Sequence, residues 1–114
     1  MPDDIDAIFI LHTWLVGTNL EPVIAESIKR KIPVLSAGHV HFDNGLLFSY
    51  GPRDEETGAQ VARLAHNILK NETHPSDIPV EKSDFFLGVN MKTAEAAGIE
   101  IPYNTLQQAD FITR

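Results

Sequence analysis

The chain of 114 residues contains no cysteine, and this absence excludes several kinds of chemistry. Disulfide bonds, thiolate metal sites and a cysteine nucleophile are all ruled out. Long apolar runs are absent too: the longest, at residues 8–11 and 46–48, fall far short of the roughly 20 residues that cross a bilayer. Met1 is followed by Pro2-Asp3-Asp4 instead of a basic and then an apolar stretch, so no secretory signal peptide is visible. From this start we expect either a cytoplasmic chain or a piece of an exported protein.

Basic residues are scarce. There are 9 Lys and Arg against 16 Asp and Glu, and the formal net charge is -7, which disfavours a nucleic-acid partner. The basic cluster Lys29-Arg30-Lys31 falls where a helix is expected to end, a position at which cations complement the helix dipole. With 43% hydrophobic and 22% charged residues, the chain has an ordinary globular composition. We therefore expect a single domain over residues 1–114.

Short apolar runs alternate with amphipathic stretches along the whole chain. The runs at 6–12, 33–36, 46–50 and 84–89 predict strands, and the first two frame a βαβ unit. Helices are predicted at 19–31, at 54–69, at 90–97 and at 104–112, and residues 71–77 around Pro75 form the best linker candidate. This alternation predicts an α/β three-layer sandwich with a mainly parallel sheet.

Individual residues mark several of the helix ends. The segment from Thr18 to Glu21 has the capping-box pattern, which places a helix start there. Asn90 is expected to cap the helix at 90–97, and Gly98 is expected to end it in the left-handed conformation. Three successive acidic residues at 54–56 suit the first turn of the third helix.

Catalytic and metal-binding motifs are mostly missing. There is no Gly-rich phosphate loop, no Gly-x-Ser-x-Gly elbow and no His-Glu-x-x-His pair, and we expect no cofactor. His39 and His41, with Asp43, have alternating spacing that a divalent ion tolerates. A convincing third and fourth ligand is lacking, so we predict that these histidines form no metal site.

A polar and aromatic cluster, His12-Thr13-Trp14, follows the carboxyl end of the first predicted strand, where open α/β sheets place their ligand crevices. Ser36 and Tyr50 also lie at or near predicted strand ends. These five residues are the predicted ligand-binding site, in which Trp14 stacks on a small molecule while hydroxyl groups orient it. The alternative is that the tryptophan only covers a loop over the core.

Beyond these patterns, the chain resembles a known family over almost its entire length. The similar segments run in the family's order at 32–34, 45–51, 56–58, 65–70, 77–80, 90–94, 97–102 and 109–110. The Asn-x-Lys-Thr-Ala run that starts at Asn90, with the Gly and Ile-Pro that follow it, is fairly specific. The segments resemble the later half of the ABC-transporter substrate-binding proteins, which are periplasmic-binding-protein-like receptors with a type I fold.

The resemblance implies two α/β lobes, of which this chain would supply one, with a small-molecule ligand enclosed between them. Some members bind aromatic amino acids, and the loaded receptor meets a membrane permease, or a sensor domain in signalling relatives, in a periplasmic or extracytoplasmic compartment. Where members commonly have Asp-Asn this chain has Thr13-Trp14, an acidic position is Gly38, and a Tyr pair is replaced by Asp54-Glu55. The ligand's identity therefore does not carry over.

The residues and the resemblance favour a non-catalytic solute-binding module. One alternative is a small α/β enzyme with His12 as general base. The other is a structural or oligomerisation fragment without its own ligand. A missing lobe also predicts a homodimer: we expect residues 45–70 to belong to a different sheet from residues 7–36, with the strand at 46–50 as an unpaired edge. Phe48, Leu64, Ile68 and Leu69 would then be exposed.

Overall fold

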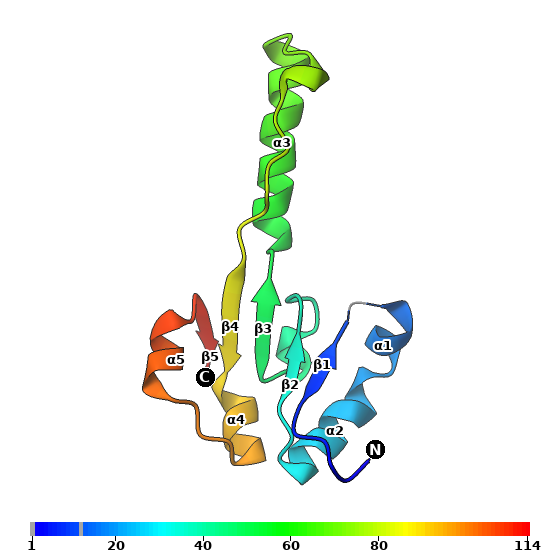
Figure 1. Ribbon diagram of the computed structural model, residues 1–114, viewed down its shortest axis with the longest axis vertical. Coiled ribbons are helices and arrows are strands. Elements are labelled where there is room, and N and C mark those ends of the chain that lie inside the picture. The colour runs from blue at the N-terminus through cyan, green and yellow to red at the C-terminus, as the bar shows by residue number, and fades with distance from the viewer. Residues whose placement is uncertain (1, 12) are drawn as a thin grey trace.

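Strands and helices alternate along the chain as the sequence predicts (Figure 1). The computed structural model describes residues 2–11 and 13–114. Its strands are β1 (Ile8–Ile10), β2 (Val34–Ser36), β3 (Phe48–Gly51), β4 (Phe86–Asn90) and β5 (Phe111–Thr113). Its α-helices are α1 (Trp14–Thr18), α2 (Leu20–Arg30), α3 (Asp54–Lys70), α4 (Met91–Ala97) and α5 (Tyr103–Gln108), with 3₁₀ turns η1 (Phe42–Asn44) and η2 (Pro75–Asp77).

The strands form one mainly parallel sheet in the order β1-β2-β3-β4-β5. β1, β2 and β3 are parallel, β4 runs antiparallel to β3, and β5 is parallel to β4. The α/β fold class with a mainly parallel sheet is confirmed. Because β1, β2 and β3 run the same way, their carboxyl ends lie at one edge of the sheet, which we call the cleft edge.

The expected separation of residues 45–70 from the first sheet is wrong for β3. Leu35 of β2 is in register with Phe48 of β3, and Phe48 is in register with Val89 of β4. β3 is therefore the central strand, with backbone partners on both sides, and the predicted unpaired edge at 46–50 does not exist.

One face of the sheet packs against α2 and η1. Side chains alternate along β1, so that Ile10 is buried while Phe9 is exposed, and Val34 of β2 shares the buried side with Ile10. The core on this covered face combines apolar residues of the strands, α2 and the η1 region: Ile10, Leu20, Ile24, Val34, Phe42 and Leu46. α4 lies beside α2 and extends this helical layer.

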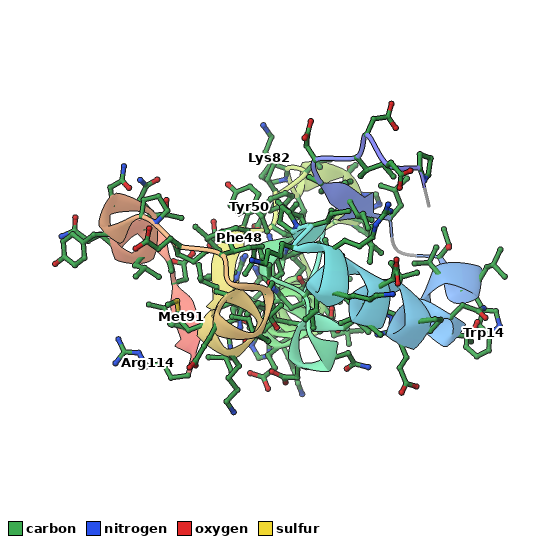
Figure 2. All side chains as sticks on the ribbon, turned by 90° about the horizontal axis from the view of Figure 1, so that it is seen from below. Trp14, Phe48, Tyr50, Lys82, Met91 and Arg114 are labelled. Atoms are coloured by element: carbon green, nitrogen blue, oxygen red, sulfur yellow. The ribbon has the colours of Figure 1, made fainter. Side chains whose placement is uncertain are left out.

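The opposite face of the sheet carries apolar side chains that remain accessible. The register and the alternation place Phe9, Leu35, Phe48, Tyr50, Phe85 and Leu87 on this face, and we call these six residues the open sheet face. Val89, in register with Phe48, lies on the same face but is 0% exposed, so the face is covered at that position. Phe9, Tyr50 and Phe85 are 60%, 57% and 54% exposed. Viewed along the strands, Phe48 and Tyr50 lie on the side of the sheet away from α2 and α4 (Figure 2). Among the described residues, α2 and α4 thus form a helical layer on one face of the sheet, whereas the predicted three-layer sandwich has helices on both faces.

α3 leaves the cleft edge and projects along the long axis, with residues 78–85 returning beside it (Figure 1). None of its residues is buried. The radius of gyration is 17.9 Å, whereas a compact domain of this length has about 13 Å. Within the described residues, no helix is long and apolar enough to cross a membrane.

The helix ends confirm some sequence signals and correct one. Asn90 Oδ1 accepts a hydrogen bond from the Thr93 amide at 3.2 Å, and Gly98 ends α4 with φ 64°. The predicted capping box at 18–21 is wrong, because the short helix α1 precedes α2 and ends at Thr18. The Thr18 hydroxyl donates back to the carbonyl oxygens of Trp14, at 3.1 Å, and of Leu15. Asn19 caps α2 without a side-chain hydrogen bond.

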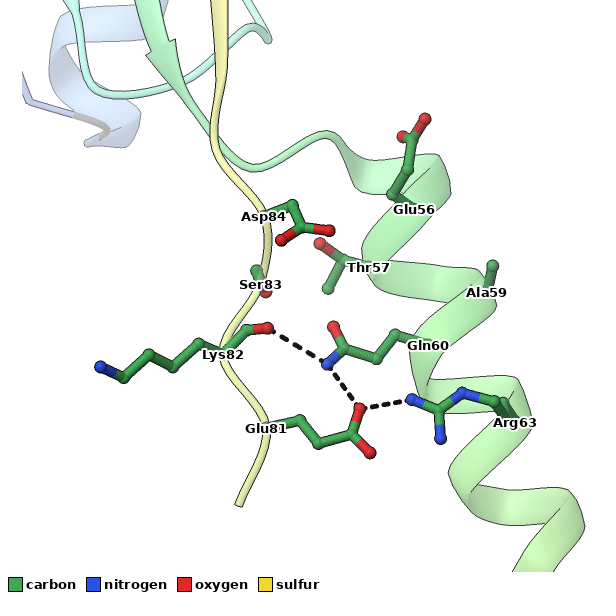
Figure 3. Close-up of a pocket in the computed structure, with 9 residues that line it drawn as sticks. All are labelled: Glu56, Thr57, Ala59, Gln60, Arg63, Glu81, Lys82, Ser83 and Asp84. Carbon is green, nitrogen blue, oxygen red and sulfur yellow. Dashed lines mark hydrogen bonds and ion pairs between the residues drawn. The ribbon is translucent and has the colours of Figure 1, made fainter. Parts of the chain in front are cut away.

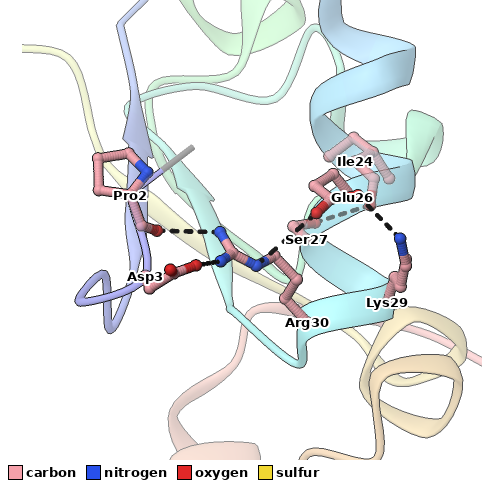
Figure 4. A network of polar contacts seen from close by, with 7 residues as sticks. All are labelled: Pro2, Asp3, Ile24, Glu26, Ser27, Lys29 and Arg30. Carbon is pink, nitrogen blue, oxygen red and sulfur yellow. Dashed lines mark hydrogen bonds and ion pairs between the residues drawn. The ribbon is translucent and has the colours of Figure 1, made fainter.

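The basic end of α2 binds residues 2–3 through Arg30 (Figure 4). The Arg30 guanidinium donates to the carbonyl of Pro2 at 2.9 Å, pairs with Asp3 and lies 3.7 Å from the Glu26 carboxylate. Lys29 and Arg30 occupy the last turn of α2, as predicted, and Lys31 ends it in the left-handed conformation.

The predicted last helix is only half right. Residues 103–108 form α5, but Phe111 and Ile112 belong to β5 and lie in register with Gly88 and Val89 of β4. Residues 111–113 pair with β4 as a parallel edge strand. This tertiary pairing outweighs the local helical pattern.

Candidate ligand-binding site

Two neighbouring cavities lie along the cleft edge and share Val40. The first, of about 470 Å³, lies between α1 and the loop after β2 and is lined by Thr13, Trp14, Gly17, Thr18, Val40 and His41. The second, of about 310 Å³, lies between the loops after β2 and β3 and is lined by Ala37, Gly38, His39, Val40, Pro52, Arg53, Asp54 and Glu55. Both sit where α/β sheets place ligand crevices.

Trp14 is 88% exposed, in contrast to the alternative in which it covers the core. It is the first residue of α1, and Thr13 caps that helix by accepting a hydrogen bond from the Val16 amide at 3.3 Å. The indole lies at the outer end of the molecule in Figure 2. The Thr13 hydroxyl acts as an acceptor in this contact, so its hydrogen remains available as a donor, and both faces of the Trp14 ring belong to an exposed side chain.

His39 holds the loop after β2 against β3. Its Nδ1 lies 2.7 Å from Ser49 Oγ and its Nε2 lies 2.9 Å from the carbonyl oxygen of Gly51. Because a carbonyl oxygen only accepts, Nε2 carries the hydrogen and Nδ1 accepts from the serine hydroxyl. The ring also meets Phe111 edge-on at 5.0 Å. Both ring nitrogens are therefore committed to protein partners.

Arg53 is a site residue that the sequence reasoning missed. It joins β3 to α3 and lines the second cavity. Its guanidinium lies 5.7 Å from the ring centroid of Phe86 and 6.0 Å from that of Phe111, while Glu56 and Glu55 approach to 3.4 and 3.8 Å. The available signal was its position directly after Gly51-Pro52, at the carboxyl end of a parallel strand.

The structure brings together only some of the predicted site residues. Thr13 and Trp14 line the first cavity. Ser36 is 2% exposed at the end of β2, its Oγ has no hydrogen-bond partner, and it lines neither cavity. Tyr50 is on the open sheet face, where its ring meets Phe85 at 5.5 Å. His12 lies outside the described residues.

A third hollow, of about 520 Å³, lies between α3 and the returning segment (Figure 3). Arg63 pairs with the Glu81 carboxylate, to which Gln60 also donates a hydrogen bond at 2.9 Å. The hydrogen bond from Arg63, and then that from Gln60, lowers the pKa of Glu81 below its ordinary value, and the same contact raises the pKa of Arg63. These groups satisfy one another, so we interpret the hollow as a seam that holds the segment to α3.

Comparison with known proteins agrees with this geometry. Residues 1–112 match the family described as ABC transporter substrate binding protein. The chain therefore belongs to the ABC transporter substrate binding protein family.

Three-dimensional relatives share the fold. A ligand-free, open structure of a substrate binding protein with adhesive properties from Clostridium difficile superposes with a TM-score of 0.78 at 28% identity, covering 97% of this chain and 37% of that one. A conserved domain protein from Vibrio cholerae has a TM-score of 0.74 at 28% identity, with 95% and 36% coverage. An ABC domain in complex with L-Trp from Streptococcus pneumoniae has a TM-score of 0.77 at 24% identity, with 96% and 37% coverage.

The chain spans about a third of the length of these relatives. An uncharacterized protein from Rickettsia prowazekii is 26% identical over 93 residues, which are 81% of this chain and 30% of that protein.

Proposed function

We propose that this chain supplies one wall of a solute-binding cleft in an ABC-type transport or sensing system, without catalysing a reaction. The observation that supports it best is the exposed Trp14 in a cavity at the cleft edge, next to a second cavity that contains Arg53. Family membership supports the same role.

The chemistry of the cleft edge favours an amino acid as the ligand. Trp14 supplies a flat apolar surface for stacking, and the Thr13 hydroxyl supplies a hydrogen bond. The second cavity carries both signs of charge, with Arg53 beside Asp54 and Glu55. A zwitterion places its carboxylate on the guanidinium and its ammonium group on the acidic side chains. Ser36 remains a candidate contact because its buried hydroxyl lacks a partner.

The proposal also includes a second lobe, a membrane partner and an extracytoplasmic location. The relatives are about three times longer than this chain, so a second lobe would close over the cleft edge. Closure on the ligand would shift the population toward a state that a membrane permease or sensor domain recognises. Such a system operates in a periplasmic or other extracytoplasmic compartment.

A homodimer also belongs to this proposal, and a purely structural or oligomerisation role is the second candidate. The exposed apolar residues on α3 and on the sheet favour both, because soluble domains seldom leave large apolar patches uncovered. Ligand binding separates the two roles: the structural candidate predicts that no small molecule stabilises the chain.

Trp14 is the only tryptophan in the chain, so its fluorescence reports directly on the first cavity. Titration with amino acids, small organic acids and sugars should find a compound that shifts the emission and raises the melting temperature by mass action. Trp14→Phe should keep binding detectable by calorimetry, whereas Trp14→Ala should weaken it about 10-fold or more. Leu15→Ala, an exposed neighbour that lines neither cavity, is the matched control. A ligand that binds Trp14→Ala with unchanged affinity would disprove the assignment.

A further inference from the structure

The loop after β2 presents an apolar residue, Val40, between two histidines. Val40 is 62% exposed, and it lines both cavities of the cleft edge. Residues 37–39 line the second cavity, whereas His41 lines the first. The loop lies between β3 and α1 (Figure 1). Val40 is therefore at the point where the two cavities meet.

His39 holds this loop on the side of β3. Both nitrogens of its ring are used in contacts with Ser49 and with the Gly51 carbonyl oxygen, and the ring meets Phe111 of β5 edge-on. A Cβ at Gly51 would collide with the carbonyl oxygen of Ala37, so the glycine lets the loop approach β3 closely. The residue before Val40 is thus fixed by two neighbouring strands.

His41 and Phe42 hold the other side of the loop. A Cβ added at Gly17 would lie 2.8 Å from His41 Nε2, so the imidazole lies directly against the backbone of α1. Phe42 is 4% exposed in the core, and its amide donates to the His39 carbonyl oxygen at 3.0 Å. Because the residues on both sides of Val40 are anchored, its isopropyl group has a fixed place between the cavities.

We propose that Val40 is the residue that determines the specificity of the ligand site, and that His39 is a positioning residue that holds it in place. This inference rests on the proposed solute-binding function and deepens it. Val40 divides the site into a charged compartment with Arg53 and an aromatic compartment with Trp14. The ligand is then an α-amino acid whose head group occupies the second cavity and whose side chain passes Val40 to reach the first.

Val40 discriminates between ligands by shape. It contacts the atoms that join the head group of the ligand to its side chain, and one added methylene at such a contact changes affinity by about 10-fold or more. A compound confined to one cavity does not pass Val40, so its affinity does not depend on the size of this residue. The ratio of the two affinities is therefore the signature of a divided site.

Two-dimensional NMR of the 114-residue chain gives each cavity its own reporter. The indole N–H of Trp14, the only tryptophan, reports on the first cavity, and the Nε–H of Arg53 reports on the second. L-Phenylalanine is the probe for both cavities, glycine for the second and benzyl alcohol for the first. L-Phenylalanine should shift both reporters and should bind at least about 10-fold more tightly than either smaller compound, because its two parts are linked.

Substitutions at Val40 change the shape of the division. Val40→Ile adds one methylene group and should weaken L-phenylalanine about 10-fold, while glycine and benzyl alcohol stay within about 2-fold. Val40→Thr keeps the branched shape and is the matched control, in which the ratio of L-phenylalanine to glycine affinity should stay within about 3-fold of the parent. The amide peaks of β4 verify that each variant is folded.

Substitutions at His39 test the positioning role. His39→Ala releases the loop from β3 and should lower the same affinity ratio about 10-fold. His39→Asn should restore part of it, because its side-chain oxygen can accept the hydrogen bond from Ser49. In the ligand-free chain, the backbone order parameter of Val40 should be about 0.85, and in His39→Ala it should fall below about 0.6.

The outcomes separate this inference from the proposed function. If another compound binds the site and these three do not, the divided site is overturned while the solute-binding role stands. The same holds if L-phenylalanine shifts only one reporter, or if Val40→Ile changes all three affinities alike or none. A Val40 order parameter below about 0.6 in the parent chain overturns the positioning role of His39. If no compound binds at all, the proposed function fails as well.

Discussion

α2 and α3 are equally amphipathic in sequence, yet the structure uses their apolar faces differently. α2 places Leu20 and Ile24 against the sheet, where they are 3% and 6% exposed. α3 has the longer apolar stripe and buries none of it. The comparison shows that periodicity identifies an apolar side of a helix but not whether a partner covers it. The covered region should therefore respond to substitution as a core, and α3 as a surface.

The largest expected difference comes from the same substitution in both helices. Ile24→Ala should lower the free energy of unfolding by about 2–5 kcal/mol, because it removes buried methyl groups and leaves a cavity. Ile68→Ala should cost less than about 1 kcal/mol in the monomer, since Ile68 is 37% exposed. Urea unfolding of both variants measures the difference. Equal losses at a concentration where the chain is monomeric would mean that α3 is packed.

Gly88 lies within β4, where the structure leaves no room for a side chain. A Cβ added at Gly88 would lie 2.5 Å from the ring of Phe111 and 2.6 Å from Ser49 Oγ. Gly88→Ala should therefore destabilise the domain by about 1–3 kcal/mol through overpacking between β3 and β5. Thermal unfolding monitored by circular dichroism checks this value. Phe111→Leu in the same background, by making room, should recover part of the loss.

His39 and His66 provide a matched pair of histidines, one in the covered region and one on α3. His39→Ala should cost about 1–3 kcal/mol, because it leaves Ser49 Oγ and the Gly51 carbonyl without their partner. His66→Ala should be within about 0.5 kcal/mol of the parent, as for other exposed positions. Zinc should not raise the melting temperature of the parent chain. Tight zinc binding by calorimetry that disappears in His39→Ala would instead establish a metal site.

Substitution of Gly58 should act in the opposite direction to that of Gly88. Gly58 lies inside α3, and among the described residues no atom outside its neighbours and the local helical backbone lies within 4 Å of an added Cβ. Gly58→Ala should stabilise the helix by about 0.5–1 kcal/mol, because alanine loses less backbone entropy on folding. Amide hydrogen exchange within α3 should slow while exchange in β3 stays the same. Faster exchange in α3 would indicate that its glycine side is in contact with another surface.

The smallest effect is expected at the seam between α3 and the returning segment. The pKa of Glu81 is lowered, so its contribution is fully present above the ordinary carboxyl pKa, about 4.3, and is lost as the pH falls through the lower folded value. Acidification below about pH 4 should release the segment, which an NMR titration of the amides at 80–82 would follow. Glu81→Gln should remove this pH dependence, and Glu100→Gln should not.

Much of the fold was predictable because it depends on local patterns. The apolar runs placed four of the five strands, the 3.6-residue period placed α2 and α3, and Asn90 and Gly98 marked both ends of α4. At the site, Thr13 and Trp14 of the polar and aromatic cluster line a cavity near the end of β1, while their role in ligand binding stays a prediction. Arg53 was missed because its importance depends on the loop after β2, which approaches it from a distant part of the sequence.

The sequence by itself determined which residues are helical or extended and which side of each element is apolar, since these follow from backbone propensity and spacing. The tertiary structure alone decided what lies opposite each apolar side. It made β3 the central strand, placed Phe111 and Ile112 of the predicted helix in β5, and left Val61 and Leu69 of α3 exposed among the described residues. The physical reason is that burial is a property of two surfaces, and a sequence pattern describes only one of them.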